Sequence, residues 1–105
     1  MPTTEKYLEG MFKKFKDIEG VGYRKMMGEY VVYYKDKVAG GIYDNRFLVK
    51  PMPSAIKMMP DAPYELPYDG AKEMLRVDDE RDSGFIRKLF EAMYDELPQL
   101  KKRKK

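Results

Sequence analysis

The chain has 105 residues, of which 43% are hydrophobic and 37% are charged, and it contains neither cysteine nor histidine. This composition is typical of one globular domain with a modest core. The missing residue types exclude a disulfide framework, a thiolate nucleophile, a cysteine- or histidine-based zinc site and serine–histidine catalysis. Because histidine is also the commonest acid–base group of enzymes, we expect a non-enzymatic protein with no cofactor and no metal.

The net charge of +3 comes from the C-terminal end of the chain and not from its body. Without the last five residues, 16 basic side chains stand against 18 acidic ones, a balance of −2. We therefore expect a single domain at residues 1–98 and a basic tail at residues 99–105. Such a tail holds polyanions through salt-sensitive phosphate contacts, so nucleic acid is one alternative partner. The candidate polyanion-binding residues are Lys101, Lys102, Arg103, Lys104 and Lys105.

The hydropathy of the chain bears on its location. No apolar run approaches the roughly 18 residues that a membrane span needs. Residues 1–6 lack the apolar segment of a signal peptide. We therefore expect a cytoplasmic protein that does not contact a membrane.

The N-terminal region predicts an amphipathic helix. Its apolar residues recur at helical spacing, with lysines and a glutamate on the opposite side. Thr3 or Thr4 is placed to cap the start of this helix, and Gly20 is a natural end. The apolar stripe consists of Leu8, Met11, Phe12, Phe15 and Ile18.

Four consecutive strands are predicted next, at residues 23–27, 29–35, 37–43 and 46–50. The turns at 35–37 and 44–46 are too short for the crossover that parallel strands need, so the last three of these strands pair as an antiparallel meander. Gly40 and Gly41 interrupt the third strand, and we expect them to accommodate a bulge or a packed helix instead of a ligand.

The second half of the chain begins with prolines that end the sheet run. Ser54 is positioned to cap a short helix at 55–59, and residues 60–70 predict a rigid loop with an extended piece at 64–68. A fifth strand is expected at 74–77. A final helix follows, with Ser83 and acidic residues as capping candidates, and ends at Pro98. Its apolar stripe consists of Phe85, Ile86, Leu89, Phe90, Met93 and Leu97.

The acidic group before this last helix resembles a set of ligands for a hard cation. It lacks the glycine and the final glutamate of a calcium loop, and the positive end of a helix attracts carboxylates. We therefore interpret these residues as part of the helix start and not as a metal site. They are Asp78, Asp79, Glu80 and Asp82.

Two segments carry a family resemblance. They read Arg24-Lys25-Met26-Met27-Gly28-Glu29-Tyr30 and Asp44-Asn45-Arg46-Phe47-Leu48-Val49-Lys50. Together with the preceding helix they resemble the N-terminal domain of the TfoX family of bacterial competence regulators, over roughly residues 4–97. The chain departs from the family pattern at Met27, where phenylalanine is common, and at Glu29, where a second glycine is common.

The resemblance implies an α+β fold. This is a two-layer α/β sandwich, in which an antiparallel sheet of five to six strands with a β-meander core has the N-terminal and C-terminal helices packed on one face. It also implies a regulatory module of transcription that acts through protein–protein contacts, here as a stand-alone member without the second domain of full-length regulators.

The second predicted strand has two apolar faces. Tyr30, Val32 and Tyr34 alternate with Val31 and Tyr33, whereas a sheet covered on one side needs one polar face. Two explanations remain open. In the first, the Pro51–Gly70 segment covers the second face of the sheet. In the second, the aromatic residues of that face stay exposed for a homodimer, a protein partner or a small ligand.

We therefore expect an interaction surface around the 24–34 hairpin. Arg24 and Lys25 lie in it, either as an anion site or as charges that protect an edge strand from aggregation. A small-ligand pocket between the sheet and the 51–70 loop, and DNA binding by the tail, are the alternatives. The candidate interaction residues are Arg24, Lys25, Met27, Gly28, Tyr30, Tyr33, Tyr34 and Arg46.

Overall fold

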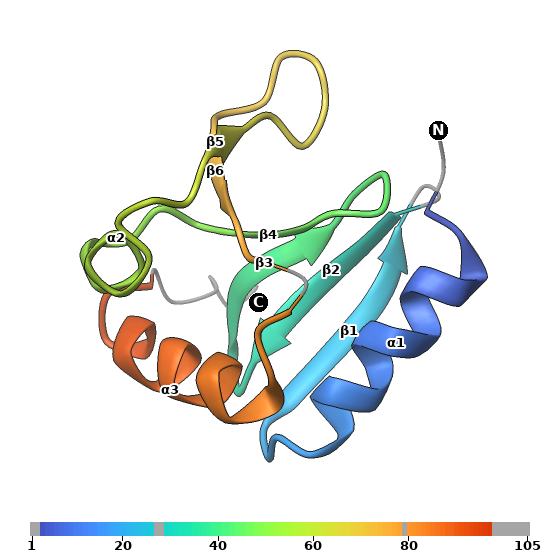
Figure 1. Cartoon of the computed structure of the whole chain (residues 1–105), viewed down its shortest axis with the longest axis horizontal. Helices are drawn as coiled ribbons and strands as arrows, with labels where there is room; N and C mark the ends of the chain where they lie inside the picture. The colour runs from blue at the N-terminus through green and yellow to red at the C-terminus, as the bar shows by residue number, and fades with distance from the viewer. Residues whose placement is uncertain (1–2, 27–28, 79, 98–105) are drawn as a thin grey trace, which may run out of the picture.

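An open six-stranded antiparallel sheet and three helices form the α+β fold (Figure 1). The computed structural model describes residues 3–26, 29–78 and 80–97. The elements are, in chain order, α1 (Glu5–Lys16), β1 (Val21–Met26), β2 (Glu29–Tyr34), β3 (Lys37–Ile42), β4 (Phe47–Val49), α2 (Pro53–Met58), β5 (Tyr64–Glu65), β6 (Met74–Arg76) and α3 (Ser83–Tyr94).

The strands lie in the order β1-β2-β3-β4-β6-β5, and all neighbours are antiparallel. The predicted meander of β2, β3 and β4 is confirmed, and β1 extends it beside β2. β1 begins at Val21, two residues before the predicted start. The predicted extended piece at 64–68 forms only a two-residue strand, β5, at one edge.

The turns of the meander explain its tight pairing. Asp44 and Asn45 both have positive φ, 51° and 60°, and Tyr43 and Arg46 exchange main-chain hydrogen bonds around them. This is the two-residue hairpin turn whose twist matches that of the strands.

The predicted irregularity at the β3 glycines is a β-bulge. Val32 pairs with Gly40 but Tyr33 pairs with Val38, so Ala39 is the extra residue. Gly40 is needed beside it, because a Cβ there would overlap the carbonyl oxygen of Leu48.

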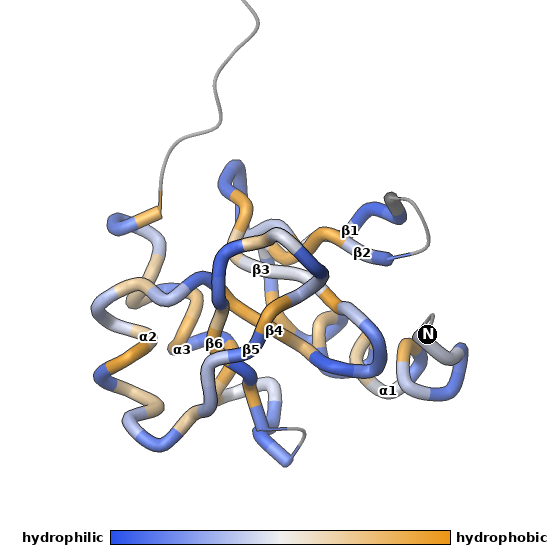
Figure 2. Tube along the Cα trace, turned by 90° about the horizontal axis from the view of Figure 1, so that it is seen from above, coloured by the Kyte–Doolittle hydropathy of each residue, from blue (hydrophilic) through white to orange (hydrophobic). Residues whose placement is uncertain are grey.

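One hydrophobic core joins the sheet to the helices. The register carries one side of the sheet from Val32 through Gly40 and Val49 to Leu75, and we call this side the core face. The buried residues of the three helices pack against it (Figure 2 shows hydrophobic residues in the central strands and mostly hydrophilic turns). The helix residues in this core are Leu8, Met11, Phe15, Ala55, Ile86, Leu89, Phe90 and Met93.

A single ring, that of Phe47 on β4, contacts both long helices. Its centroid lies 5.4 Å from that of Phe15 on α1 and 6.1 Å from that of Phe90 on α3. Phe47 is 1% exposed. Helices from opposite ends of the chain therefore meet around one side chain of the sheet.

The end of α3 is bonded to the turn between β2 and β3. Lys37 donates from Nζ to the carbonyl oxygen of Tyr94 at 2.8 Å, and its ammonium lies 4.1 Å from the centre of the Tyr94 ring. The Tyr94 hydroxyl donates to Asp36 at 2.7 Å, and this bond is the main cause of the raised pKa of Tyr94. A cation beside the last carbonyl groups of a helix is also favoured by the helix dipole.

The long helices begin as the sequence predicts. Thr4 accepts from the Tyr7 N–H at the start of α1, and Asp82 accepts from the Phe85 N–H at the start of α3. α3 ends at Tyr94, earlier than predicted, and Pro98 lies outside the described residues.

The prediction that Ser54 caps α2 is wrong. The N-cap residue is Met52, which has no side-chain hydrogen bond, and Pro53 is the first helical residue. The missing acceptor comes from Glu96, just beyond α3. One of its carboxylate oxygens accepts from the Ser54 N–H at 3.0 Å and the other from the Ser54 hydroxyl at 2.6 Å.

We predict that Phe47→Ala lowers the free energy of unfolding by about 3–5 kcal/mol, because it leaves a cavity between the sheet and both long helices. Urea denaturation followed by circular dichroism measures the loss. Ile56→Ala, which truncates an apolar side chain of α2 that is 40% exposed, is the control and costs less than about 1 kcal/mol. Equal losses in the two variants would contradict the role of Phe47.

The bonds from Ser54 lower the pKa of Glu96, the hydroxyl bond more than the N–H bond. A lowered pKa stabilises the fold above the ordinary glutamate pKa, and this contribution disappears as the pH falls through the lowered value. We predict that Ser54→Ala melts below the wild type at pH 7 and that the gap narrows in acid. When Glu96→Gln is added to both the wild type and Ser54→Ala, the difference between their melting temperatures should not change with pH. A gap that is constant in the wild-type background would contradict the prediction.

Candidate interaction surface

The side of the sheet opposite the core is the second face. Residues directly opposite one another across the ladder share a side, so Arg24, Val31, Gly41, Leu48 and Arg76 form one row across five strands. Leu48 is fully buried yet lies outside the hydrophobic core cluster, and Val31 beside it is half-buried. The second face therefore has an apolar centre between two arginines.

The next row of the second face extends this apolar centre. Tyr33 on β2 lies opposite Val38 on β3, and both side chains are half-buried. The buried residues of all three described helices belong to the core cluster on the other side. In the described part of the chain, Val31, Tyr33 and Val38 thus lie on a face to which no helix contributes core residues.

The Pro51–Gly70 segment covers only one end of this face. Its helix, α2, joins the core, and β5 extends the sheet beside β6. On the second face, Glu65 of β5 pairs with Arg46 and Arg76, and the loop after β5 places the ring of Tyr68 edge-on to that of Tyr43 at 6.2 Å. The Tyr43 ring in turn lies against Gly41, where a Cβ would be 2.6 Å from it.

The pKa of Tyr43 reflects this partial cover. It is raised, first by burial of the hydroxyl and then by the neighbouring Tyr68 and Glu29. Tyr68 itself is 64% exposed. The cover therefore ends at the Tyr43–Tyr68 contact, and the part of the face on β1 and β2 lies beyond it.

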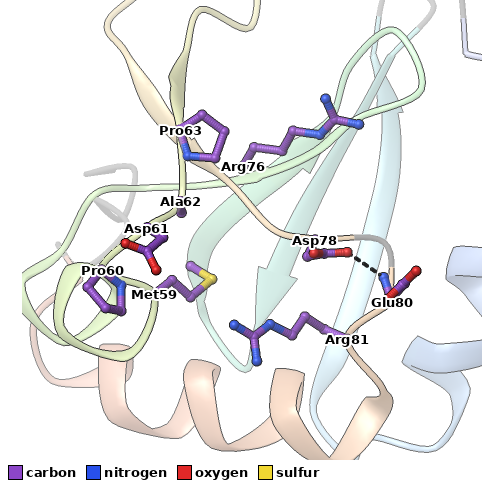
Figure 3. A pocket seen from close by; sticks show the side chains of 9 residues that line it. All are labelled: Met59, Pro60, Asp61, Ala62, Pro63, Arg76, Asp78, Glu80 and Arg81. Atoms are coloured by element: carbon purple, nitrogen blue, oxygen red, sulfur yellow. Dashed lines mark hydrogen bonds between the residues drawn. The ribbon is translucent and has the colours of Figure 1, made fainter.

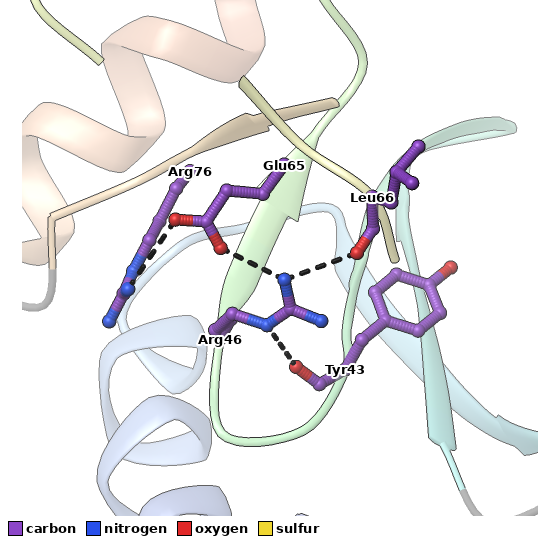
Figure 4. A network of polar contacts seen from close by, with 5 residues as sticks. All are labelled: Tyr43, Arg46, Glu65, Leu66 and Arg76. Atoms are coloured by element: carbon purple, nitrogen blue, oxygen red, sulfur yellow. Dashed lines mark hydrogen bonds and ion pairs between the residues drawn. The ribbon is translucent and has the colours of Figure 1, made fainter. Parts of the chain in front are cut away.

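Arg46, a predicted interaction residue, is bonded within the protein and supports this loop. Its Nη1 donates to Glu65 at 2.9 Å and to the carbonyl oxygen of Leu66 at 3.1 Å, while Nε donates to the carbonyl oxygen of Tyr43 (Figure 4). Glu65 also lies 3.6 Å from Arg76. Only 19% of the Arg46 side chain is exposed, because these bonds hold it against the sheet.

The prediction of Tyr34 as a residue of the interaction surface is wrong. It is 3% exposed and faces the core, where its ring contacts those of Phe90 and Tyr94. Tyr30 shares the core face and is half-buried edge-on against the Phe12 ring. The alternation along β2 places both rings on the helix side.

The other predicted interaction residues on β1 and β2 differ in exposure. Arg24 and Lys25 are exposed on β1, and Tyr33 is half-exposed on the second face. Met27 and Gly28 lie outside the described residues, as does the whole basic tail.

Sequence reasoning missed several exposed apolar side chains. Tyr64, Leu66 and Tyr68 alternate along the segment that contains β5 and are 50%, 45% and 64% exposed. The alternation of apolar residues with prolines at 63 and 67 was a signal for an extended, outward-facing piece. Tyr23 is 44% exposed although its ring stacks on Phe12 at 3.9 Å.

A pocket of about 540 Å³ lies between residues 59–63 and 76–81, near the place proposed for a small-ligand site (Figure 3). Both guanidinium groups in its wall already have neighbours. Arg81 lies 4.0 Å from the centre of the Phe85 ring, and Arg76 pairs with Glu65. Throughout the described residues, no buried side-chain nitrogen or oxygen lacks a hydrogen-bond partner. The pocket therefore presents no buried polar group that requires a ligand.

The acidic residues before α3 serve local structure. Asp82 caps the helix and Asp78 accepts from the Glu80 N–H at 2.9 Å, whereas Asp79 lies outside the described residues. Among residues 3–26, 29–78 and 80–97, no group of three acidic side chains is placed to hold a metal ion. None of the helices in these ranges is long and apolar enough to cross a membrane.

Part of the chain is similar to a known protein. Over 55 residues, 52% of this chain, it is 38% identical to an uncharacterized 12.7 kDa protein in the trpE 5′ region of Spirochaeta aurantia. The match covers 48% of that protein, so the chain spans about half of its length. No protein-family model and no solved structure matches the chain.

We predict different effects on stability when the two arginines of the predicted surface are replaced by alanine. Arg46→Ala removes three hydrogen bonds from a mostly buried guanidinium, and we expect the free energy of unfolding to fall by about 1.5–3 kcal/mol. Arg24→Ala, which truncates an exposed arginine, should change it by less than about 0.5 kcal/mol. Urea denaturation compares the two. If Arg46→Ala were as mild as Arg24→Ala, the support of the 64–70 loop by Arg46 would be wrong.

Proposed function

We propose that this protein is a non-enzymatic regulatory module, similar to the N-terminal domain of TfoX-type regulators, that binds a protein partner or a second copy of itself. The binding surface is the part of the second face formed by Val31, Tyr33 and Val38. The observation that supports the proposal is that this apolar patch lies beyond the cover given by the Tyr43–Tyr68 contact.

The chemistry of the patch favours a protein over a small molecule. An aromatic and two aliphatic side chains form its centre, and Arg24 lies at its β1 border. Aromatic residues and arginine are enriched at protein interfaces, where the centre is apolar and the border polar. The patch lies on a sheet face, whereas small-ligand sites are concave.

The other candidates have less support. The pocket beside residues 59–63 is of a size that suits a small ligand, but its charged groups have neighbours within the protein. DNA binding by Lys101–Lys105 rests on composition alone, because the tail lies outside the described residues.

Site-specific photocrosslinking tests the proposal. We expect a photoreactive phenylalanine analogue at position 33 to trap a partner on illumination. In the purified protein the product has twice the monomer mass of 12.4 kDa when the partner is a second copy, and in a cell extract it is a discrete heavier band when the partner is another protein. The same analogue at the exposed Lys57 position on α2 gives neither product.

Tyr33→Glu provides the second arm, since a buried charge in the patch breaks the contact. If the partner is a second copy, the mass measured by light scattering should then fall to that of the monomer. With the photoreactive residue at position 31 of this variant, the crosslink yield should fall to that of the position-57 control. Tyr34→Glu is not a usable variant, because that side chain lies in the core. Equal crosslinking from positions 33 and 57, or none from either, would contradict the second face as the binding surface.

A further inference from the structure

The two edges of the sheet differ. β1 is six residues long and pairs only with β2, and no described residue pairs with its other side. The opposite edge, β5, has two residues and lies between Pro63 and Pro67. Proteins block edge strands by shortening them and by placing proline there. β5 is blocked in this way, whereas β1 contains no proline.

The ladder shows which main-chain groups of β1 are available. The Lys35 N–H donates to the carbonyl oxygen of Gly20 at 2.6 Å, where the β1–β2 pairing begins. Hydrogen-bonded and non-hydrogen-bonded pairs alternate along an antiparallel ladder. The even-numbered residues of β1 therefore bond to β2, and the N–H and C=O groups of Tyr23 and Lys25 point away from it.

A groove runs beside this edge, between α1 and β1. It has a volume of about 530 Å³, and Phe12, Phe15, Val21 and Tyr23 give it an apolar base. The Tyr23 ring is fixed there, parallel to the Phe12 ring within 3°. An incoming strand on the edge would thus place alternate side chains next to a preformed aromatic surface.

The charges around the edge favour an acidic occupant. Arg24 and Lys25 are exposed on β1 itself, and Lys13 and Lys16 line the groove. In the described part of the chain none of these four cations has an ion-pair partner. Of the carboxylates nearby, Glu9 lies in the groove lining, and Asp17 and Glu19 lie in the turn before β1. A fourth, that of Glu29 on β2, already accepts from the Thr3 hydroxyl and the Asp44 N–H.

We propose that the β1 edge binds an extended acidic segment of a partner protein, which adds to the sheet as a further strand. The main-chain groups of Tyr23 and Lys25 bond to the segment, and its acidic side chains meet the basic residues of the edge and groove. Strand addition of this kind takes affinity from main-chain bonds and specificity from alternate side chains. A second copy fits less well, because pairing centred on Arg24 sets this residue against its own equivalent.

This surface shares only Arg24 with the patch on the second face, and its test uses Lys25, so either proposal can fail without the other. The probe is a fluorescent seven-residue peptide of alternating glutamate and valine with threonine ends. We expect saturable binding by anisotropy, with amide shifts at Tyr23 and Lys25 in NMR spectra. A peptide with lysine in place of glutamate should not bind, and added salt should weaken the acidic peptide.

Two substitutions at Lys25 distinguish the contribution of the main-chain hydrogen bond to binding from that of the side-chain charge. Lys25→Gln keeps the N–H, and we expect the affinity to fall about two- to fivefold, as for one exposed ion pair. Lys25→Pro also removes an N–H that β2 does not use, and binding should fall at least about tenfold, the effect of losing one net hydrogen bond as well. Lys57→Gln on α2 is the matched control and should bind as the wild type does.

The melting temperature of Lys25→Pro shows whether this variant is folded. Peptides methylated on alternate amide nitrogens test the main-chain hydrogen bonds in the wild-type protein. Methylation on one set of residues should abolish binding and on the other set preserve it. Equal binding by Lys25→Pro and Lys25→Gln, by both methylated peptides, or by the lysine peptide would overturn the proposal. Self-association that is lost in Lys25→Pro would assign the edge to a second copy instead.

Discussion

The contact of the Phe47 ring with Phe15 and Phe90 is the constraint on which the arrangement of this protein depends. It brings the first and last helices to the same side chain, although 75 positions separate the two phenylalanines that meet it. The buried apolar residues of the helices thereby belong to the core face. Among the described residues, the cover on the opposite side of the sheet comes from Glu65 and the loop after β5, and the candidate binding patch lies beyond it.

Residues at and just beyond the end of α3 bond to the β2–β3 turn and to the start of α2. Lys37 and Asp36 bind Tyr94 from the β2–β3 turn, and Glu96 supplies the acceptor that the start of α2 lacks. These bonds join segments that are 42 to 58 residues apart. A change at the end of α3 is therefore expected to disturb both a strand turn and a second helix.

Sequence reasoning predicted the local features and failed where the partner is distant. The short turns at 35–37 and 44–46 required the meander, and Thr4 and Asp82 have the cap positions that their residue types favour. Alternation along β2 separates Tyr33 from Tyr34 but does not say which ring faces the helices. Likewise, nothing near Arg46 in the sequence identifies Glu65 as its partner, and a serine before a short helix is an ordinary cap unless a residue such as Glu96 arrives from elsewhere.

The shortness of β5 between its two prolines has a consequence for stoichiometry. A sheet with two usable edges can add copies without limit, and such head-to-tail addition produces filaments. Here growth can begin only at β1, so one added strand, or one pairing of β1 with its equivalent, completes the sheet. Among copies of this chain, assembly through the edges of the sheet therefore stops at two bodies, however high the concentration becomes.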